Sequence, residues 1–323
     1  MSEVILSVRQ LETTFFSKLG AFHAVNKISY DIYKGETLGI VGESGCGKSV
    51  TSFSLMRLIE RPGKITGGQV LLNGRDLLKL SDPAMETVRG GEMAMIFQEP
   101  MTALNPVMTI GQQIDEQVLR HKKGSPQEAR ERAIEMLSLV GIPSPSQRYS
   151  SYPHQLSGGM RQRAMIAMAL SCDPTFLVAD EPTTALDVTI QAQILELIQS
   201  LQQKLNMTVQ FITHDLGVIS EISDRVMVMY GGQTCEIGKT QEIFLHPRHP
   251  YTHALIKSRP RLGNRVDRLM TIEGSVPAPH ELPPGCPFTN RCPRATEQCR
   301  AHKPPLIDVS SGHKVACFFP MES

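Results

Sequence analysis

The stretch Gly42-Glu43-Ser44-Gly45-Cys46-Gly47-Lys48-Ser49 decides the fold, because it fits the pattern GxxxxGK[ST] between a predicted strand and a predicted helix. The strand is the apolar run 37–41, and the helix has apolar residues at helical spacing up to Arg61-Pro62-Gly63. Glycines let consecutive backbone N–H groups surround phosphate oxygens, and the helix N-terminus adds its positive dipole end. We therefore expect all eight residues to bind a nucleotide, with Lys48 on the β- and γ-phosphates and Ser49 on Mg²⁺.

A second apolar strand, 175–179, ends in the paired acids Asp180 and Glu181. An acid at the carboxyl end of a parallel strand lies where ligands bind in open α/β sheets. We expect Asp180 to hold Mg²⁺ through a water molecule, and Glu181 to act as the general base that orients the attacking water. Paired acids are otherwise common at solvated strand ends, but the phosphate loop argues against that interpretation here.

The alternation of strands and helices predicts an α/β fold with a largely parallel sheet and helices on both faces. Together with the phosphate loop, this pattern resembles a P-loop NTPase core of the RecA-like type. Further strands are predicted at 93–97, 209–213 and 226–230, and helices at 190–204 and 216–222. The first 31 residues alternate apolar and polar side chains and predict an antiparallel β subdomain. Within a helical insertion at about 99–170, Ser125 and Glu128 form a capping-box pattern for a helix that ends at Gly141.

The composition of the chain excludes several classes of function. The 323 residues carry a formal net charge of +1 and no Trp, which argues against binding to nucleic acid or to an anionic membrane. The N-terminus does not read as a signal peptide, and no apolar run approaches the roughly 20 residues needed to span a bilayer. A membrane function would therefore require docking on other subunits that cross the membrane.

The run Leu156-Ser157-Gly158-Gly159-Met160 narrows the class of nucleotide hydrolase. Ser157 is a natural N-cap, and the two glycines expose backbone N–H groups at the start of the apolar helix 164–170. This is a second anion-binding helix end, and one chain does not need two such ends for one nucleotide. Two chains facing head to tail do need them, because each then supplies one half of a shared site.

These motifs resemble, in order and separation, those of the ATP-binding-cassette (ABC) ATPase family over about the first 240 residues. The resemblance implies a Q-loop residue that contacts Mg²⁺ and water, Gln98, and a D-loop at 184–187 that ends in Asp187. It also implies that His214 is the switch histidine on the γ-phosphate and that Phe15 stacks on adenine, with Phe16 as the alternative. Met160 departs from the common LSGGQ signature, while the serine and both glycines are kept.

The family resemblance also implies how the protein works. ATP binds at composite sites between two ATPase subunits, and its hydrolysis is coupled to a permease through a groove beside the Q-loop, lined by residues 99–111. The segment His249-Pro250-Tyr251-Thr252 and the long tail that follows resemble the C-terminal extension of the oligopeptide/dipeptide (peptide/nickel) importer ATPases. We accordingly divide the chain into an ATPase domain, residues 1–245, and a Pro- and Cys-rich extension, residues 246–323.

This subfamily resemblance implies an ATPase subunit that powers import of dipeptides or oligopeptides. Its expected partners are a second, non-identical ATPase, two transmembrane permease subunits and an extracytoplasmic peptide-binding protein, but not nucleic acid. Its expected location is the cytoplasmic face of a bacterial membrane, as a peripheral subunit. Two alternatives remain, namely the same machinery importing nickel or another small solute, and a soluble ABC ATPase of translation or DNA repair.

Four cysteines, Cys286, Cys292, Cys299 and Cys317, cluster near the C-terminus with the spacing C-x5-C-x6-C-x17-C. This differs from the paired C-x2-C pattern of most structural zinc sites. Four thiolates without histidine suit an iron–sulfur cluster or Zn²⁺, and four reduced cysteines without metal are equally compatible with the spacing. The subfamily resemblance implies a 4Fe–4S cluster at these positions.

Overall fold

The computed structural model describes residues 3–18, 20–184, 186–258 and 272–322. Contacts divide the chain into two compact parts. The P-loop part consists of Val4–Ile32, Glu36–Leu78 and Ile212–Ser323. The signature part consists mainly of Lys79–Phe211. The domain boundary at residue 245 is not tested by this division and stays a prediction.

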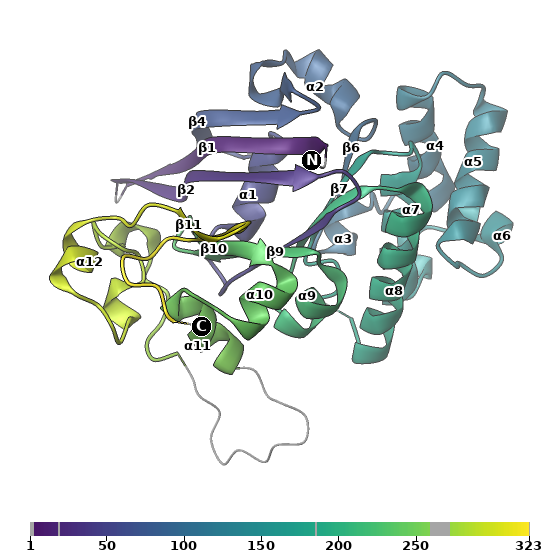
Figure 1. The fold of residues 1–323 in the computed structure, drawn as a ribbon. Helices are drawn as coiled ribbons and strands as arrows, with labels where there is room; N and C mark the ends of the chain where they lie inside the picture. Colours follow the sequence, from purple (N-terminus) through teal and green to yellow (C-terminus); the bar gives the residue numbers. More distant parts are fainter. Residues whose placement is uncertain (1–2, 19, 185, 259–271, 323) are drawn as a thin grey trace. The chain divides into compact units, whose positions relative to one another are not determined.

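The P-loop part begins with a sheet in the order β2-β1-β4-β5 (Figure 1). Its strands are β1 (Val4–Ser17), β2 (Gly20–Tyr33), β4 (Gly63–Leu72) and β5 (Arg75–Asp76). β1 pairs with β4 in antiparallel register from Leu6 opposite Leu72 to Phe15 opposite Gly63, with register shifts near Glu12. The predicted antiparallel β subdomain is confirmed, because period-two alternation over two long segments is typical of a sheet with one buried face.

The same part contains a second group of strands in the order β11-β12-β10-β9-β3. They are β3 (Thr37–Val41), β9 (Arg225–Tyr230), β10 (Gln233–Lys239), β11 (Ile307–Ser310) and β12 (His313–Val315). β3 and β9 are parallel, as expected, whereas β10, β11 and β12 are all added in antiparallel pairs. The sheet is therefore more mixed than the sequence predicted. Two short strands of the C-terminal extension, β11 and β12, form its edge.

Short helices accompany these strands. They are α1 (Lys48–Leu55), α9 (Leu216–Ile222), α10 (Thr240–Leu245), α11 (Pro250–Lys257) and α12 (Glu297–Ala301), with 3-10 turns at Leu77–Lys79, Pro279–Glu281 and Thr289–Arg291. α9 packs on β3, while α10 and α11 pack on β10. Within the extension, α11 thus packs on β10, the strand that also pairs with β12.

Helix α1 ends earlier than predicted, at Leu55 rather than near Arg61. Arg57 adopts a left-handed conformation with φ +52°. The N–H of Arg57 bonds to the carbonyl of Ser54, and the N–H of Leu58 bonds to the carbonyl of Phe53. These two bonds form a Schellman motif, which ends a helix by satisfying its last carbonyls. The sequence did not reveal the end because an arginine occupies the position where glycine is usual.

The signature part combines three buried strands with most of the helices. The strands are β6 (Met93–Ile96), β7 (Phe176–Asp180) and β8 (Thr208–Ile212), and all of their residues are buried. The helices are α2 (Asp82–Val88), α3 (Pro100–Ala103), α4 (Ile110–His121), α5 (Pro126–Leu139), α6 (Pro145–Tyr149), α7 (Gly158–Leu170) and α8 (Val188–Leu205), with a 3-10 turn at Pro153–Gln155. β6 and β7 are parallel.

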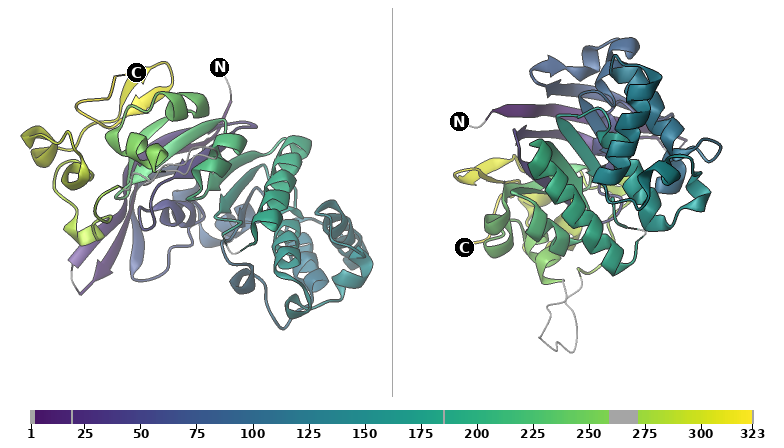
Figure 2. Two further views of the ribbon diagram at one scale, coloured as in Figure 1. Left: turned by 90° about the horizontal axis from the view of Figure 1, so that it is seen from below. Right: turned by 90° about the vertical axis from the view of Figure 1, so that its right-hand side faces the viewer.

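The predicted helical insertion is present as α3 to α7. Helices α4, α5 and α7 pack against one another, and Figure 2 shows this teal group from two further directions. The capping box of α5 forms as predicted between Ser125 and Glu128. Across the residues that the structure describes, none of the helices combines the length and apolar character that crossing a membrane requires.

Candidate functional site

The phosphate loop connects β3 to α1 and holds its own lysine. Lys48 is the first residue of α1, is only 5% exposed, and donates hydrogen bonds to the carbonyls of Gly42 (2.8 Å) and Glu43 (3.2 Å). The carbonyls keep the ammonium at the mouth of the loop, on the side where the helix N-terminus begins. Such a placement suits a cation that must reach phosphate oxygens, and the role of Lys48 on the phosphates stays a prediction.

Two positions of the loop must be glycine, because other backbone segments lie too close to leave room for a side chain. A Cβ on Gly42 would lie 2.3 Å from the carbonyl oxygen of Met229, and one on Gly47 would lie 2.4 Å from that of Ala24. Gly47 also has φ +99°, where side chains are strained. Gly45, by contrast, has open space where its Cβ would point. The loop is therefore wedged between neighbouring backbone segments at its two ends and open in its middle.

The paired acids and the Q-loop residue meet in the signature part. Asp180 ends β7 and is 2% exposed. The amide of Gln98 donates to Glu181 Oε2 at 3.0 Å, and the hydroxyl of Thr184 donates to the same oxygen at 2.9 Å. Glu181 has a left-handed backbone with φ +46°. A non-glycine residue in that conformation is strained, and such strain is concentrated at functional sites.

The signature serine caps a helix as predicted. Ser157 accepts a hydrogen bond from the N–H of Met160 at 3.3 Å, and α7 begins at Gly158. Gly159 has no room for a side chain, since its Cβ would lie 2.9 Å from Ile190. Asp187 is the N-cap residue of α8, although its side chain makes no capping bond. Ala185, in the predicted D-loop, lies outside the described residues.

Two further predicted residues belong to the P-loop part. His214 is exposed and lies just before α9, whose N-terminus is capped by Asp215. The ring of Phe15 stacks on that of Phe22, with centroids 5.7 Å apart, while Phe16 is 51% exposed. The γ-phosphate role of His214 and the adenine role of Phe15 stay predictions. The structure thus brings Gln98 and Glu181 together in one part, and the phosphate-loop residues together in the other.

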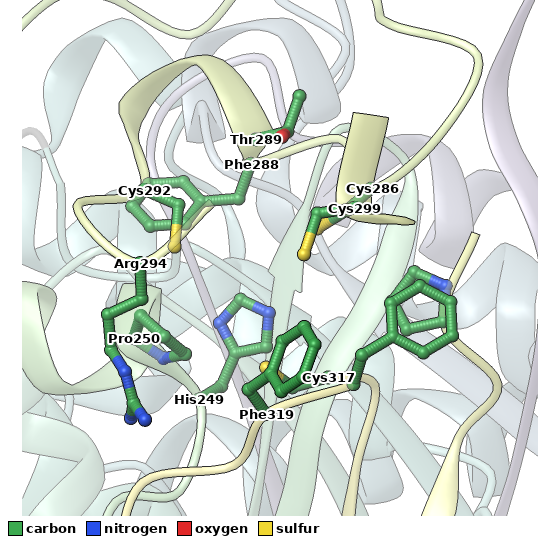
Figure 3. A pocket seen from close by; sticks show the side chains of 12 residues that line it. His249, Pro250, Cys286, Phe288, Thr289, Cys292, Arg294, Cys299, Cys317 and Phe319 are labelled. Carbon is green, nitrogen blue, oxygen red and sulfur yellow. The ribbon is translucent and has the colours of Figure 1, made fainter. Parts of the chain in front are cut away.

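The four C-terminal cysteines line one cavity. Cys286 and Cys292 flank the 3-10 turn Thr289–Arg291, Cys299 is on α12, and Cys317 follows β12; Figure 3 shows them around His249 and Phe319. Burial, and then the charges of the other three thiols, raise the pKa of Cys286 to about 11. Within the described part of the chain, no three His, Cys, Asp or Glu residues are grouped so as to hold a single metal ion.

The sequence interpretation missed two residues that touch the phosphate loop. Arg291 forms an ion pair with Glu43, and the N–H of Glu43 donates to the hydroxyl of Tyr251. In the sequence, Tyr251 stands out only as part of the motif His249-Pro250-Tyr251-Thr252, and no pattern marks Arg291. The partners are more than 200 positions apart, so no local pattern could reveal either contact.

Comparisons with known proteins agree with this geometry. Residues 25–184 match the family "ABC transporter", and residues 235–299 match "Oligopeptide/dipeptide transporter, C-terminal region". The dipeptide transport ATP-binding protein DppD of Bacillus subtilis is 52% identical, with 98% of this chain and 95% of that protein covered. The DppD protein of Escherichia coli is 48% identical, with 98% and 97% covered.

Solved structures show the same fold. MJ0796, described as a bacterial ABC transporter cassette and solved as a dimer, has a TM-score of 0.66 and 27% identity, with 73% of this chain and 98% of that chain covered. CbiO1 from Clostridium perfringens, part of an ABC transporter complex, has a TM-score of 0.64 and 27% identity, with 76% and 92% covered. The chain therefore belongs to the ATPases of the ABC transporter family, and to the group that carries the oligopeptide/dipeptide transporter C-terminal region.

Proposed function

We propose that this ABC ATPase powers the import of dipeptides or oligopeptides through a multi-subunit transporter, as a peripheral subunit on the cytoplasmic face of a bacterial membrane. The observation that carries the proposal is that relatives named for dipeptide and oligopeptide transport are about half identical over nearly the whole chain, extension included. Its proposed partners are a second, non-identical ATPase, two permease subunits and an extracytoplasmic peptide-binding protein.

Reconstitution tests the cargo. The complex is assembled in vesicles with its permeases and binding protein, and ATP-dependent uptake of a labelled dipeptide is compared with uptake of Ni²⁺. We expect peptide uptake that stops when Lys48 is replaced by alanine. Uptake of nickel with no uptake of peptide would refute the proposed cargo but leave the ATPase assignment intact.

Within this function, ATP is proposed to bind between the phosphate loop of one ATPase and Ser157, Gly158 and Gly159 of its partner. The cap at Ser157 supports this, because it leaves the first N–H groups of α7 directed outward from a helix end. Combining Lys48→Ala in this subunit with arginine in place of the signature serine of the partner ATPase tests the geometry. If the sites are composite, both substitutions fall in one site and the other site keeps its activity, whereas independent sites would both be disabled.

The reaction at each site is in-line attack of water on the γ-phosphate, in which catalysis is mainly positioning and charge stabilisation. Glu181 is the proposed base, held by Gln98, and His214 is proposed to contact the γ-phosphate. Lys48 neutralises phosphate charge. Mg²⁺, when bound, offsets the charge of the phosphate oxygens, and its proposed ligands are Ser49, Asp180 and Gln98.

The proposed docking surface for the permease is the segment 99–111, directly after the Q-loop residue. Two apolar side chains in it are exposed, Met101 at 49% and Val107 at 79%. Two exposed apolar residues within one short segment favour a protein contact. Val107→Glu should abolish co-purification with the permease. Leu119→Glu on α4, also an exposed apolar position, is the matched control, and equal effects of both would refute the surface.

We propose that the four-cysteine cavity holds a 4Fe–4S cluster. The proposal is supported by the four thiols, which enter one cavity from separate segments of the extension. Burial and mutual proximity raise the pKa values of Cys286, Cys292 and Cys317, a cost that a bound cationic group would reverse. When bound, the cluster would link the segments that carry the cysteines.

Metal analysis after anaerobic purification tests this site. We expect iron and sulfide in similar amounts and a brown colour, both lost in Cys292→Ser. Cys172→Ser is the matched control, because Cys172 is a buried cysteine outside this cavity, and it should keep the iron. Colourless protein that contains zinc alone would overturn the cluster.

A further inference from the structure

A buried arginine of the extension holds the second residue of the phosphate loop. Arg291 donates to both carboxylate oxygens of Glu43, at 2.7 and 3.1 Å, and its side chain is 5% exposed. Its other bonds go to the hydroxyl of Tyr230 (3.3 Å) and to the carbonyls of residues 272–274 (2.9 to 3.2 Å). A two-pronged pair of this kind fixes the position and the orientation of a carboxylate.

The backbone of the same loop residue is held by a tyrosine. The N–H of Glu43 donates to the hydroxyl of Tyr251 at 3.0 Å. Tyr251 lies on α11, is fully buried, and packs edge-on against Tyr230 and at a tilt against Phe288, with centroids 4.7 and 5.3 Å apart. Rings packed in this way leave the hydroxyl little freedom, so the acceptor for the Glu43 N–H is pre-positioned.

Glu43, which is held in this way, also binds the lysine of the phosphate loop. Its carbonyl, with that of Gly42, accepts the hydrogen bonds of the Lys48 ammonium. The N–H and the carboxylate of one residue are thus held by the extension, while its carbonyl holds the lysine. A shift of the Glu43 backbone would therefore move an acceptor of Lys48.

The charge of Glu43 adds a second reason for the restraint. A carboxylate in a loop that binds a triphosphate repels its ligand, because like charges a few ångströms apart interact strongly where water is excluded. Arg291 neutralises that carboxylate and holds it in one direction. Burial alone lowers the pKa of Arg291, but the hydrogen bonds to Glu43 and Tyr230 leave it raised, so the guanidinium stays charged.

We propose that the C-terminal extension braces the phosphate loop, with Arg291 and Tyr251 as positioning residues that set its affinity for ATP. The inference goes beyond peptide transport, because it makes nucleotide binding depend on a segment outside the nucleotide-binding motifs. It rests only on the assignment of Gly42 to Ser49 as the nucleotide site. That assignment is checked separately by Lys48→Ala, which should abolish binding.

The test measures binding of a fluorescent ATP analogue, methylanthraniloyl-ATP with Mg²⁺, to the full-length chain. Arg291→Gln should weaken binding about tenfold, as for a loss of roughly 1.4 kcal/mol. Arg300→Gln is the matched control, since Arg300 is an exposed arginine of the same extension, and it should bind as the wild type does. Wild-type affinity in Arg291→Gln would overturn the brace.

A double variant separates positioning from general stability. Arg291→Gln leaves the Glu43 carboxylate unpaired, so adding Glu43→Gln should restore part of the affinity by removing the repulsion. A purely structural role for Arg291 would give no such recovery, and a double variant that binds no better than Arg291→Gln contradicts the charge argument. If Arg291→Gln does not fold, Tyr251→Phe decides, because it removes only the acceptor; unchanged affinity there also overturns the proposal.

Discussion

The side-chain amide of Gln98 donates a 3.0 Å hydrogen bond to the carboxylate of Glu181. The two residues come from the ends of the parallel strands β6 and β7, which brings a neutral donor to the proposed base. Thr184 donates to the same oxygen. Gln98 also immediately precedes the segment proposed to contact the permease. A movement of that segment would therefore shift Gln98 and change the orientation of the Glu181 carboxylate that it binds.

Replacing Glu181 by glutamine should stop turnover but keep ATP binding. The amide has nearly the same shape as the carboxylate but cannot accept a proton, and positioned general bases typically contribute about 10²- to 10⁴-fold in rate. We expect kcat to fall by that order in the assembled complex, with the affinity for ATP almost unchanged. ATPase assays check the fall in kcat, and nucleotide-binding titrations check that the affinity for ATP is almost unchanged.

The control for this variant is Glu131→Gln, an exposed glutamate on α5 that should leave kcat unchanged. Full ATPase activity in Glu181→Gln would remove Glu181 from the role of base. A loss of binding together with turnover would show instead that the Glu181 carboxylate also contributes to ATP binding.

Replacing Gly47 by alanine should destabilise the fold more than replacing Gly45. Both have positive φ values, +99° and +80°, so both variants carry strain of about 1–2 kcal/mol. Only at Gly47 would the new methyl group also meet a backbone carbonyl, that of Ala24, at 2.4 Å. Urea unfolding of both variants measures the difference. Equal urea midpoints for the two variants would show that the backbone near Ala24 moves away from the new methyl group at little cost in free energy.

Local signals predicted the core of the fold well. Strand β3 and helix α9 have the predicted bounds, and the capping box of α5 forms between the predicted residues. In each case the signal lies within a few positions: an unbroken apolar run, a cap, or a helical repeat. The end of α1 was wrong because the residue that ends it is Arg57, whose left-handed conformation has no sequence signal.

The residues of the candidate site also fall into those that a local pattern predicts and those that it does not. Residues whose position is set by a local motif, such as Lys48 bonded to Gly42 or Ser157 at the start of α7, follow from spacing alone. Arg291 does not, because its partner Glu43 is 248 positions away and an arginine in a Pro-rich tail is unremarkable by itself. Long-range pairing depends on how β12 joins β10, which a single sequence does not encode in any short pattern.

Replacing Ser125 by alanine should cost about 1 kcal/mol of stability. The Ser125 hydroxyl accepts the N–H of Glu128 at 3.3 Å, and the Ser125 N–H donates to the Glu128 carboxylate at 2.6 Å. The variant leaves the first turn of α5 without its side-chain acceptor. Urea unfolding measures the loss. Ser138→Ala, at an exposed position of the same helix, should cost less, and an equal cost would contradict the cap.

The same capping box should weaken in acid. Bonds from the backbone and then the side chain of Ser125 lower the pKa of Glu128, so its folded pKa is below its unfolded value. The stabilisation is therefore present above the unfolded pKa and is lost as the pH falls through the folded pKa. The gap between wild type and Ser125→Ala should narrow as unfolding is measured at lower pH. A constant gap would show that the bond from the Ser125 hydroxyl to the Glu128 carboxylate takes no part.

The extension should depend strongly on one buried hydrogen-bonded pair. Glu236 of β10 and His313 of β12 lie 2.6 Å apart with side chains 0% and 3% exposed, and Glu236 also accepts the N–H groups of Arg248 and His249. Glu236→Ala would leave all three donors buried without that acceptor, and each buried donor left without a partner costs about 1–3 kcal/mol. Urea unfolding should show this loss, whereas Glu242→Ala, an exposed acid on α10, should cost less than about 1 kcal/mol. If the two variants are equally stable, water or a shifted side chain replaces the lost carboxylate, and the pair does not anchor β12 to β10.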